Sequence, residues 1–262
     1  MSGQDEAQAR PVRRARKAAP AGPMHAFRSS RRDYLTHGID EFPLPMRLLY
    51  AFALAVVYAF ACLRWHARVE GEDELVAHVR GRGSVLVMNH VSMLEPVIVV
   101  TRLWRRGVRV RPLYKSEFDR IGPARFFFPR IGAIPVVRDT ADLTAVRAAK
   151  EALLRGECVL VYPEGTRVKD DEQKVEVHGG FAMIAQMGKS DVVPMAIVGA
   201  ADPYHTRPTR ARRPRIRIGA PIAFAELGVE GRKAQMAEME RVAMGRVYEI
   251  RDELRRENPG LW

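Results

Sequence analysis

The chain has 262 residues, enough to bury one sizeable hydrophobic core, so one large folded domain is expected rather than two. It carries 43 Lys and Arg against 31 Asp and Glu, a formal net charge of +12. The two cysteines, Cys62 and Cys158, lie in apolar runs and are expected to be free, buried thiols. This content excludes a disulfide-stabilised scaffold, and no Cys/His spacing typical of a metal site is present.

The basic excess is concentrated at the amino terminus. Residues 1–32 hold eight Lys and Arg but only two acidic residues, a net of +6 that is half of the total. The segment is rich in Ala, Gly, Pro and Arg, which predicts a basic disordered tail over residues 1–33. Such a tail can serve solubility, bind anionic lipid headgroups at about 1 kcal/mol per basic residue, or bind nucleic acid. We favour an anionic membrane surface and expect no nucleic-acid partner, because no nucleic-acid recognition motif is present.

An uncharged apolar segment follows the tail. Residues 48–63 contain no charged side chain, and Arg47 and Arg64 bracket them. As a helix this segment would be about 24 Å long, shorter than the hydrocarbon core of about 30 Å. We predict a membrane-associating helical segment over residues 34–67, with a short basic helix at 26–34 on the headgroups. A buried core helix is the alternative.

From Val69 onward, strand and helix patterns alternate. Short apolar runs predict strands at Ser84–Asn89, Val108–Tyr114, Ala133–Val137, Cys158–Tyr162, Val192–Gly199 and Arg215–Ile218. Helical spacing predicts helices at Leu94–Arg105, Ala141–Arg155, Gly180–Gln186 and Arg232–Glu257. This alternation indicates the α/β class, with a mostly parallel mixed sheet flanked by helices in a domain of residues 68–262.

His90 and Glu95 are the most informative pair of residues. They follow the strand expected at Ser84–Asn89, at the carboxyl end where α/β proteins place reactive groups. A histidine can take a proton from a hydroxyl near neutral pH, and a nearby carboxylate can hold its ring in the required tautomer. Taken alone, the pair is better explained as polar residues that satisfy backbone groups at a strand end.

Basic side chains follow three other predicted strands. These residues are Lys115, Arg138 and Arg167. Because the carboxyl ends of parallel strands lie along one rim of a sheet, we expect all three cations to surround a crevice that also contains His90. Such a crevice suits a substrate that carries both a hydroxyl and a phosphate.

The turn Pro163–Arg167 has features of an anion-binding loop. Gly165 lets the backbone approach a ligand closely, and Arg167 offers a fork of donors that matches phosphate geometry. Glu164 can accept a hydrogen bond from a hydroxyl of the same substrate. In isolation, an Arg–Glu surface pair at a turn would explain these residues better.

Together these residues resemble the glycerolipid acyltransferase family, whose four sequence blocks occur here in order over residues 66–220. The blocks are Asn89-His90 with Glu95, Gly132 to Arg138, Pro163 to Arg167, and the apolar run Val192 to Ala196 through Pro194. Two departures are present. The acid of the first block is usually Asp, and a basic residue that often precedes Gly-x-Phe is absent from Val177 to Phe181.

The resemblance implies a role for each residue. His90 would be the general base and Glu95 would orient it, with Lys115, Arg138 and Arg167 holding the phosphate. Within the third block, Glu164 would place the glycerol, alongside Gly165 and Thr166. Asn89, Gly132 and Pro194 would support the site. No metal or cofactor is implied, and the acyl donor would be acyl-CoA or acyl carrier protein.

The resemblance also implies a reaction. The family transfers a fatty acyl group to the sn-2 hydroxyl of 1-acylglycerol-3-phosphate (lysophosphatidate) and forms phosphatidic acid, without an acyl-enzyme. We therefore expect phospholipid biosynthesis at the cytoplasmic face of the plasma membrane. Transfer to another lysolipid, to glycerol-3-phosphate or to a lipid amino acid remains open, as does a non-catalytic lipid-binding protein.

Overall fold

The computed structural model describes residues 27–93, 95–137, 142–168, 172–200 and 213–261. Its strands are β1 (Arg68–Glu70), β2 (Val85–Met88), β3 (Val110–Lys115), β4 (Ile134–Val136), β5 (Cys158–Val161), β6 (Val192–Val198) and β7 (Arg215–Ile218). Its α-helices are α1 (Arg31–Thr36), α2 (Leu44–Trp65), α3 (Glu72–His78), α4 (Glu95–Arg105), α5 (Gly122–Arg130), α6 (Leu143–Leu154), α7 (Gly180–Gly188) and α8 (Arg232–Glu257). Short 3₁₀ helices are η1 (Ile39–Glu41), η2 (Ser116–Arg120) and η3 (Phe224–Glu226).

The strands form one 7-stranded sheet in the order β1-β7-β6-β2-β5-β3-β4. All neighbours pair in parallel except β6 and β7, which are antiparallel. The predicted α/β class with a mostly parallel mixed sheet is therefore confirmed. Since β2, β5 and β3 are adjacent and parallel, their carboxyl ends open onto the same edge of the sheet.

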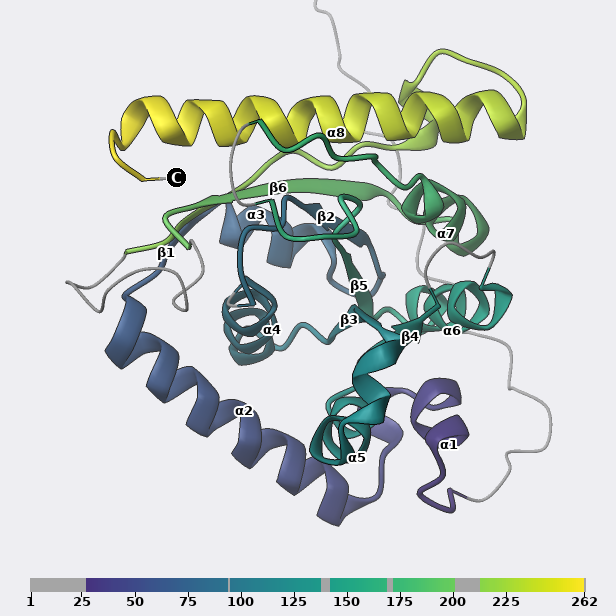
Figure 1. Cartoon of the computed structure of the whole chain (residues 1–262). Coiled ribbons are helices and arrows are strands. Elements are labelled where there is room, and N and C mark those ends of the chain that lie inside the picture. Colours follow the sequence, from purple (N-terminus) through teal and green to yellow (C-terminus); the bar gives the residue numbers. More distant parts are fainter. Residues whose placement is uncertain (1–26, 94, 138–141, 169–171, 201–212, 262) are drawn as a thin grey trace, which may run out of the picture.

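Helices cover both faces of the sheet (Figure 1). In β2, Leu86 and Met88 pack into a core beneath α2, α3 and α4, whereas Val85 and Val87 pack into a second core beneath α6, α7 and α8. The side chains alternate in this way because successive residues of a strand point to opposite faces. Burial on both faces explains why β2 is a continuous apolar run rather than an alternating one.

The structure corrects the end of the predicted disordered tail. Residues 27–33 belong to the folded part, and α1 begins at Arg31 with Ser30 and Asp33 forming a capping box. Tyr34 is 1% exposed and its ring meets Phe42 edge to face. The predicted basic helix at 26–34 is therefore a helix at Arg31–Thr36 that packs against the protein. The rest of the tail, residues 1–26, lies outside the described residues.

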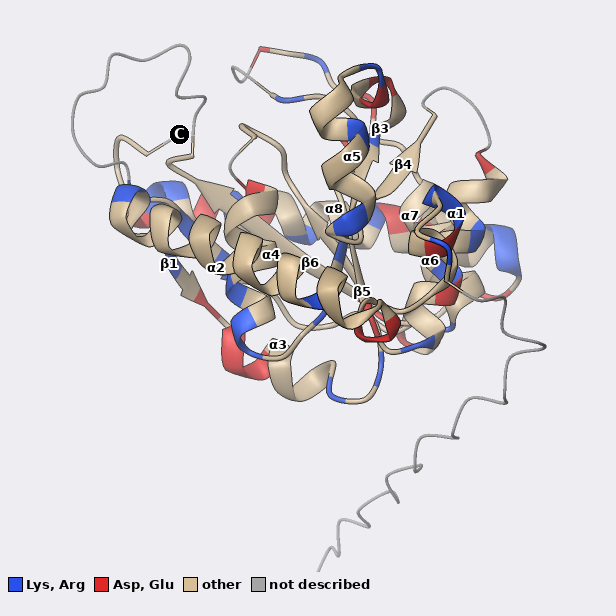
Figure 2. Cartoon of the chain, turned by 90° about the horizontal axis from the view of Figure 1, so that it is seen from below, with Lys and Arg blue, Asp and Glu red and all other residues tan. Residues whose placement is uncertain are grey.

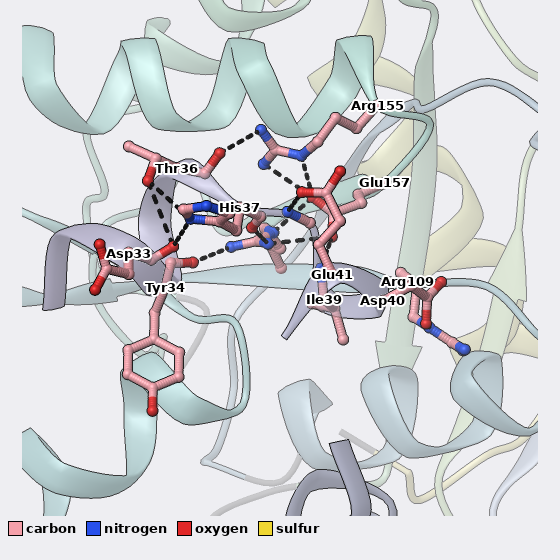
Figure 3. A network of polar contacts seen from close by, with 12 residues as sticks. Asp33, Tyr34, Thr36, His37, Ile39, Asp40, Glu41, Arg109, Arg155 and Glu157 are labelled. Atoms are coloured by element: carbon pink, nitrogen blue, oxygen red, sulfur yellow. Dashed lines mark hydrogen bonds and ion pairs between the residues drawn. The ribbon is translucent and has the colours of Figure 1, made fainter. Parts of the chain in front are cut away.

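A buried ion pair attaches this amino-terminal segment to the sheet (Figure 3). Arg111 in β3 is fully buried, and its Nε donates to Glu157 Oε2 at 2.8 Å. The Arg111 guanidinium also donates to the main-chain oxygens of Tyr34 at 2.8 Å and His37 at 2.6 Å. The second Glu157 oxygen accepts from the Ile39 amide at 2.7 Å. One charge pair thus satisfies backbone groups from a segment more than 70 residues away in sequence.

Helix α2 is longer than the 16-residue apolar segment predicted. It spans 22 residues, about 33 Å. It begins at Leu44, between Pro43 and Pro45, because proline is tolerated at the start of a helix. Of the helices that the structure describes, it alone is long and apolar enough to cross a membrane. One face, with Tyr50, Leu54 and Ala61, is buried.

The opposite face of α2 is apolar and exposed. It consists of Leu48, Phe52, Val56, Phe60 and Leu63, of which Leu63 is 79% exposed. This exposure argues against the alternative of a buried core helix. It also explains why Cys62 is exposed rather than buried as expected, whereas Cys158 in β5 is buried.

Candidate active site

His90 lies two residues beyond the end of β2, at the carboxyl edge of the sheet. The preceding Asn89 is 2% exposed and forms two hydrogen bonds with Ile197 of β6: its side-chain nitrogen donates to the carbonyl at 3.0 Å, and its oxygen accepts from the amide at 2.8 Å. This double contact fixes the end of β2 against β6. It leaves the His90 side chain 15% exposed, so a substrate can reach its ring.

Glu95, at the start of α4, faces the His90 ring from within the protein. His90 Nδ1 lies 3.4 Å from Glu95 Oε2, and the Glu95 side chain is fully buried. This is ion-pair distance, although the contact lacks the geometry of a formed hydrogen bond and neither atom has another hydrogen-bond partner among the described residues. Catalytic hydrogen bonds are often long in the absence of substrate. The arrangement directs Nδ1 toward the carboxylate and leaves Nε2 available to accept a proton.

The other Glu95 oxygen organises the turn between β2 and α4. Oε1 accepts the amide hydrogens of Val91 at 2.6 Å and Ser92 at 2.5 Å. The carboxylate therefore closes this turn and faces the imidazole at the same time. The glutamate at this position, where the family usually has aspartate, still reaches the histidine.

The Pro163–Arg167 turn follows β5 and holds the main chain of His90 on both sides. Glu164 Oε2 accepts from the His90 amide at 2.7 Å, and the His90 carbonyl accepts from the Val168 amide at 2.7 Å. Glu164 is almost completely buried, and this burial raises the pKa of its carboxyl, against the opposing effect of the His90 amide. His90 and the predicted anion-binding turn are therefore one connected unit.

Gly165 is required by the shape of this turn. Its φ is +61°, and a Cβ added there would lie 2.8 Å from Cδ2 of His178. His178 belongs to the Val177–Phe181 stretch, where the family often has a basic residue, and its ring covers Gly165. Thr166 is exposed at the tip of the turn, and its amide donates to the Glu164 carbonyl at 2.7 Å.

Two of the three predicted cations are described. Lys115 ends β3, with its Nζ 3.0 Å from Glu117 Oε1, and Arg167 is half-buried in the turn after β5. Since β3 pairs with β5 and β5 pairs with β2, both residues lie on the same edge as His90. Arg138 lies outside the described residues.

Gly132 and Pro194 lie away from the crevice. Gly132 precedes β4, at the opposite edge from His90; its φ is +79°, and a Cβ added there would lie only 2.8 Å from Cδ1 of Ile39. Pro194 is inside β6 and pairs with Val87. Both residues shape the sheet, and the supporting role expected for them stays a prediction. Among the described residues, no group of three or more His, Cys, Asp or Glu could hold a metal ion.

This constellation can be compared with known proteins. The Acyltransferase family model matches residues 66–198, half of the chain, from the start of the sheet to the end of β6. The chain belongs to the acyltransferase family. The matched region contains His90, Glu95 and the Pro163–Arg167 turn.

Individual relatives of this acyltransferase are distant. A 1-acyl-sn-glycerol-3-phosphate acyltransferase of Bacillus subtilis is 25% identical over 211 residues, which are 79% of this chain and 98% of the relative. An enzyme of the same name from Helicobacter pylori is 24% identical over 136 residues, 51% of this chain and 56% of the relative. The crystal structure of a 1-acyl-sn-glycerophosphate acyltransferase from Thermotoga maritima shares the fold, with a TM-score of 0.51, 21% identity, and coverage of 84% of this chain and 80% of that one.

Sequence reasoning missed one residue of the acyltransferase site. The Tyr162 ring lies 4.4 Å from the His90 ring, with 31° between their planes. Its buried hydroxyl has no hydrogen-bond partner among the described residues, and burial raises the pKa of this phenol well above its usual value. The neutral Tyr162 ring therefore packs against the imidazole of His90. The sequence signal that could have identified Tyr162 is its position directly before Pro163-Glu164.

Replacing Glu164 of the acyltransferase by glutamine is expected to remove a pH-dependent loss of stability. Below the usual pKa of glutamate, the carboxyl is protonated in both folded and unfolded chains. Because burial raises its pKa in the folded state, the unfolded chain ionises first as pH rises, and the free energy of unfolding falls until the folded-state pKa is passed. Urea unfolding of wild type and Glu164→Gln across this pH range measures the difference.

The control for this prediction is Glu230→Gln, which changes an exposed glutamate. It should leave the pH dependence of unfolding unchanged relative to wild type. The same pH slope for wild type and Glu164→Gln would contradict a raised pKa at Glu164.

Proposed function

We propose that this acyltransferase transfers a fatty acyl group from an acyl thioester to the sn-2 hydroxyl of 1-acylglycerol-3-phosphate, giving phosphatidic acid. The observation that carries the proposal is the contact between His90 and two groups: a buried carboxylate 3.4 Å from its Nδ1, and the Pro163–Arg167 turn bonded to its main chain. The names of the curated relatives support lysophosphatidate as the acceptor.

In the proposed reaction, His90 Nε2 removes the proton of the glycerol hydroxyl as its oxygen attacks the thioester carbonyl. The carbon–sulfur bond then breaks, and the leaving thiolate takes the proton from the imidazolium. Glu95 stabilises the imidazolium between these steps. General-base catalysis of this kind typically contributes about 10²- to 10⁴-fold, and correct positioning of both substrates must supply much of the rest.

We assign the substrate phosphate to the cationic side of the crevice. The Arg167 guanidinium can bind a phosphate through two parallel hydrogen bonds, and Lys115 adds a point charge at the end of the neighbouring strand. A glycerol held by its phosphate here would place its free hydroxyl toward His90, because the turn that carries Arg167 is bonded to the His90 main chain. Contact of Glu164 with the glycerol stays a prediction.

Replacing Arg167 by alanine is expected to raise KM for lysophosphatidate by about tenfold or more, because a charge-assisted hydrogen bond to the phosphate is lost. KM for the acyl thioester should change much less. Initial rates with each substrate varied in turn provide the measurement. Arg147→Ala, which removes an exposed arginine of α6, is the control and should leave both constants unchanged. Equal effects of Arg167→Ala on both substrates would argue against a phosphate contact.

We further propose that α2 lies along the membrane surface rather than crossing it. It packs beside α4 of the catalytic domain, so a spanning orientation would draw charged residues of α4, such as Arg102 and Arg105, into hydrocarbon. Its exposed apolar face can instead enter the headgroup and acyl boundary. We place this contact at the cytoplasmic face of the plasma membrane, where acyl-CoA or acyl carrier protein supplies the acyl group.

A substrate panel tests the proposed function. The purified protein should release thiol from an acyl thioester with lysophosphatidate, and much less with glycerol-3-phosphate or lysophosphatidylcholine. Faster turnover with either of the other acceptors would replace the proposed substrate. No turnover with any acceptor would favour a non-catalytic lipid-binding protein.

A further inference from the structure

A pocket lies between α1 and α5, outside the crevice that contains His90. Its volume is about 330 Å³, and its lining includes three arginines and two aromatic rings: Arg31, Arg125, Arg130, Tyr34 and Phe126. α5 runs from the end of β3 to the start of β4, and the pocket extends along its flank. None of these residues has a part in the acyl-transfer site described above.

Two buried polar atoms of residues that line the pocket have no hydrogen-bond partner among the residues that the structure describes. Tyr34 is 1% exposed, its side chain points away from Glu157 and Arg155 (Figure 3), and its hydroxyl makes no hydrogen bond to any described residue. The Arg130 Nε is likewise buried and unbonded. Buried polar groups in folded proteins are nearly always paired, and a ligand that accepts from both of these donors would satisfy them. An Nε–H can only donate and a phenol readily does so, and the ligand must therefore present acceptor oxygens.

The charges around the pocket favour an anion. Among the described residues, neither Arg125 nor Arg130 forms an ion pair, whereas Arg31 pairs with Asp119. The guanidinium of Arg130 is held over the Phe126 ring, 3.7 Å from its centroid, and donates to the Phe126 carbonyl at 2.6 Å. Guanidinium groups held in this way match the oxygens of a phosphate.

The surroundings of the pocket identify a lipid as the source of that phosphate. Phe126 is 56% exposed and Ile121 is 53% exposed, although both are large and apolar. Figure 2 shows α5, with its basic positions, on the same side of the molecule as α2, which carries the exposed apolar face. A membrane in contact with α2 would therefore bring lipid headgroups to α5.

We propose that the pocket between α1 and α5 binds the phosphate group of an anionic phospholipid. This second lipid site is separate from the site of acyl transfer, and it holds the α5 side of the enzyme on the membrane surface. The Tyr34 hydroxyl and the Arg130 Nε donate to the phosphate oxygens, and Arg125 contributes the exposed charge. The proposal does not require that the acceptor of the acyl group be lysophosphatidate.

Vesicle sedimentation of the full chain tests the proposal, with phosphatidylcholine vesicles that contain or lack phosphatidate. Arg125→Gln should weaken binding to phosphatidate vesicles by about fivefold, and the double variant Arg125→Gln/Arg130→Gln by about tenfold or more. Tyr34→Phe removes no charge and should weaken the same binding by about threefold. All variants should bind pure phosphatidylcholine vesicles as wild type does.

Arg120→Gln is the matched control, because Arg120 is an exposed arginine close to α5 that does not line the pocket. It should weaken binding by no more than about twofold at physiological salt, where exposed charges are screened. If Arg120→Gln and Arg125→Gln weakened vesicle binding equally, the binding would depend only on general surface charge, and the proposed site would be overturned. Wild-type binding by Tyr34→Phe would also overturn it. Should the double variant unfold, Arg125→Gln and Tyr34→Phe decide alone.

Two further measurements distinguish a lipid phosphate from a free anion, and the lipid site from the acyl-transfer site. Inorganic phosphate without vesicles should leave the unfolding temperature of wild type unchanged; a rise that Arg125→Gln abolishes would assign the pocket to a free anion instead. Thiol release with detergent-solubilised substrates should be the same in wild type and Arg125→Gln. If wild type shows no turnover at all, the proposed function fails, whereas the vesicle measurements still decide the lipid site.

Discussion

Replacing His90 by alanine is expected to lower acyl transfer by about 10²- to 10⁴-fold while the protein stays folded. The imidazole lies between the buried Glu95 carboxylate and solvent: its Nδ1 is 3.4 Å from Glu95 Oε2, and the His90 side chain is 15% exposed. In the proposed reaction this ring accepts the proton of the attacking hydroxyl, and alanine cannot. Thiol release under saturating substrates measures the effect, and circular dichroism checks the fold.

The control for the His90 variant is His66→Asn. His66 is exposed at the end of α2 and has a φ of +47°, a conformation that asparagine tolerates. This variant removes an imidazole of the same chain without touching the crevice and should retain wild-type turnover. A folded His90→Ala protein within a few fold of wild-type activity would contradict a base at this position.

Replacing Arg111 by methionine is expected to destabilise the fold by about 3–5 kcal/mol. The substitution leaves the Glu157 carboxylate buried with only Arg155 opposite it, and it removes the donors to the main-chain oxygens of Tyr34 and His37. The amino-terminal segment, with α1 and the start of α2, would lose its attachment to the sheet. Urea unfolding of both proteins at neutral pH measures the loss.

A matched variant lies two residues away. Arg109 also donates to a carboxylate of the amino-terminal segment, Asp40, at 2.9 Å, but Asp40 is largely exposed. Exposed ion pairs are typically worth about 0–1 kcal/mol, so Arg109→Met should cost far less than Arg111→Met. Similar losses in the free energy of unfolding for the two variants would show that burial does not increase the contribution of the Arg111–Glu157 pair to stability.

The sheet could be predicted because its central strands are buried on both faces. Such strands are short, continuous apolar runs between turn residues, and β2 and β5 matched their predicted positions within two residues. By contrast, β1 has three residues, two of them charged, and its pairing with β7 involves a segment nearly 150 residues away. Helix α5 was not predicted either, because two prolines and three aromatic residues weaken its helical pattern.

The site shows the same division between local and distant information. His90, Glu95 and the Pro163–Arg167 turn were found because each stands in a local motif at a strand end. The sequence did not reveal that Asn89 bonds to Ile197 or that Glu164 faces the His90 amide, since these contacts join positions 108 and 74 residues apart. The end of the tail was misplaced for a similar reason: the residues that follow it, Tyr34 and His37, are bonded to the distant, buried Arg111.

The central claim is that His90 activates a lipid hydroxyl for direct attack on an acyl thioester. The most direct measurement is a single assay that quantifies released thiol and phosphatidic acid together, with and without lysophosphatidate. We predict that wild type forms the two products one for one, only when lysophosphatidate is present, and that His90→Ala forms neither at a comparable rate. Thiol release by wild type in the absence of lysophosphatidate, or equal product formation by His90→Ala, would contradict the claim.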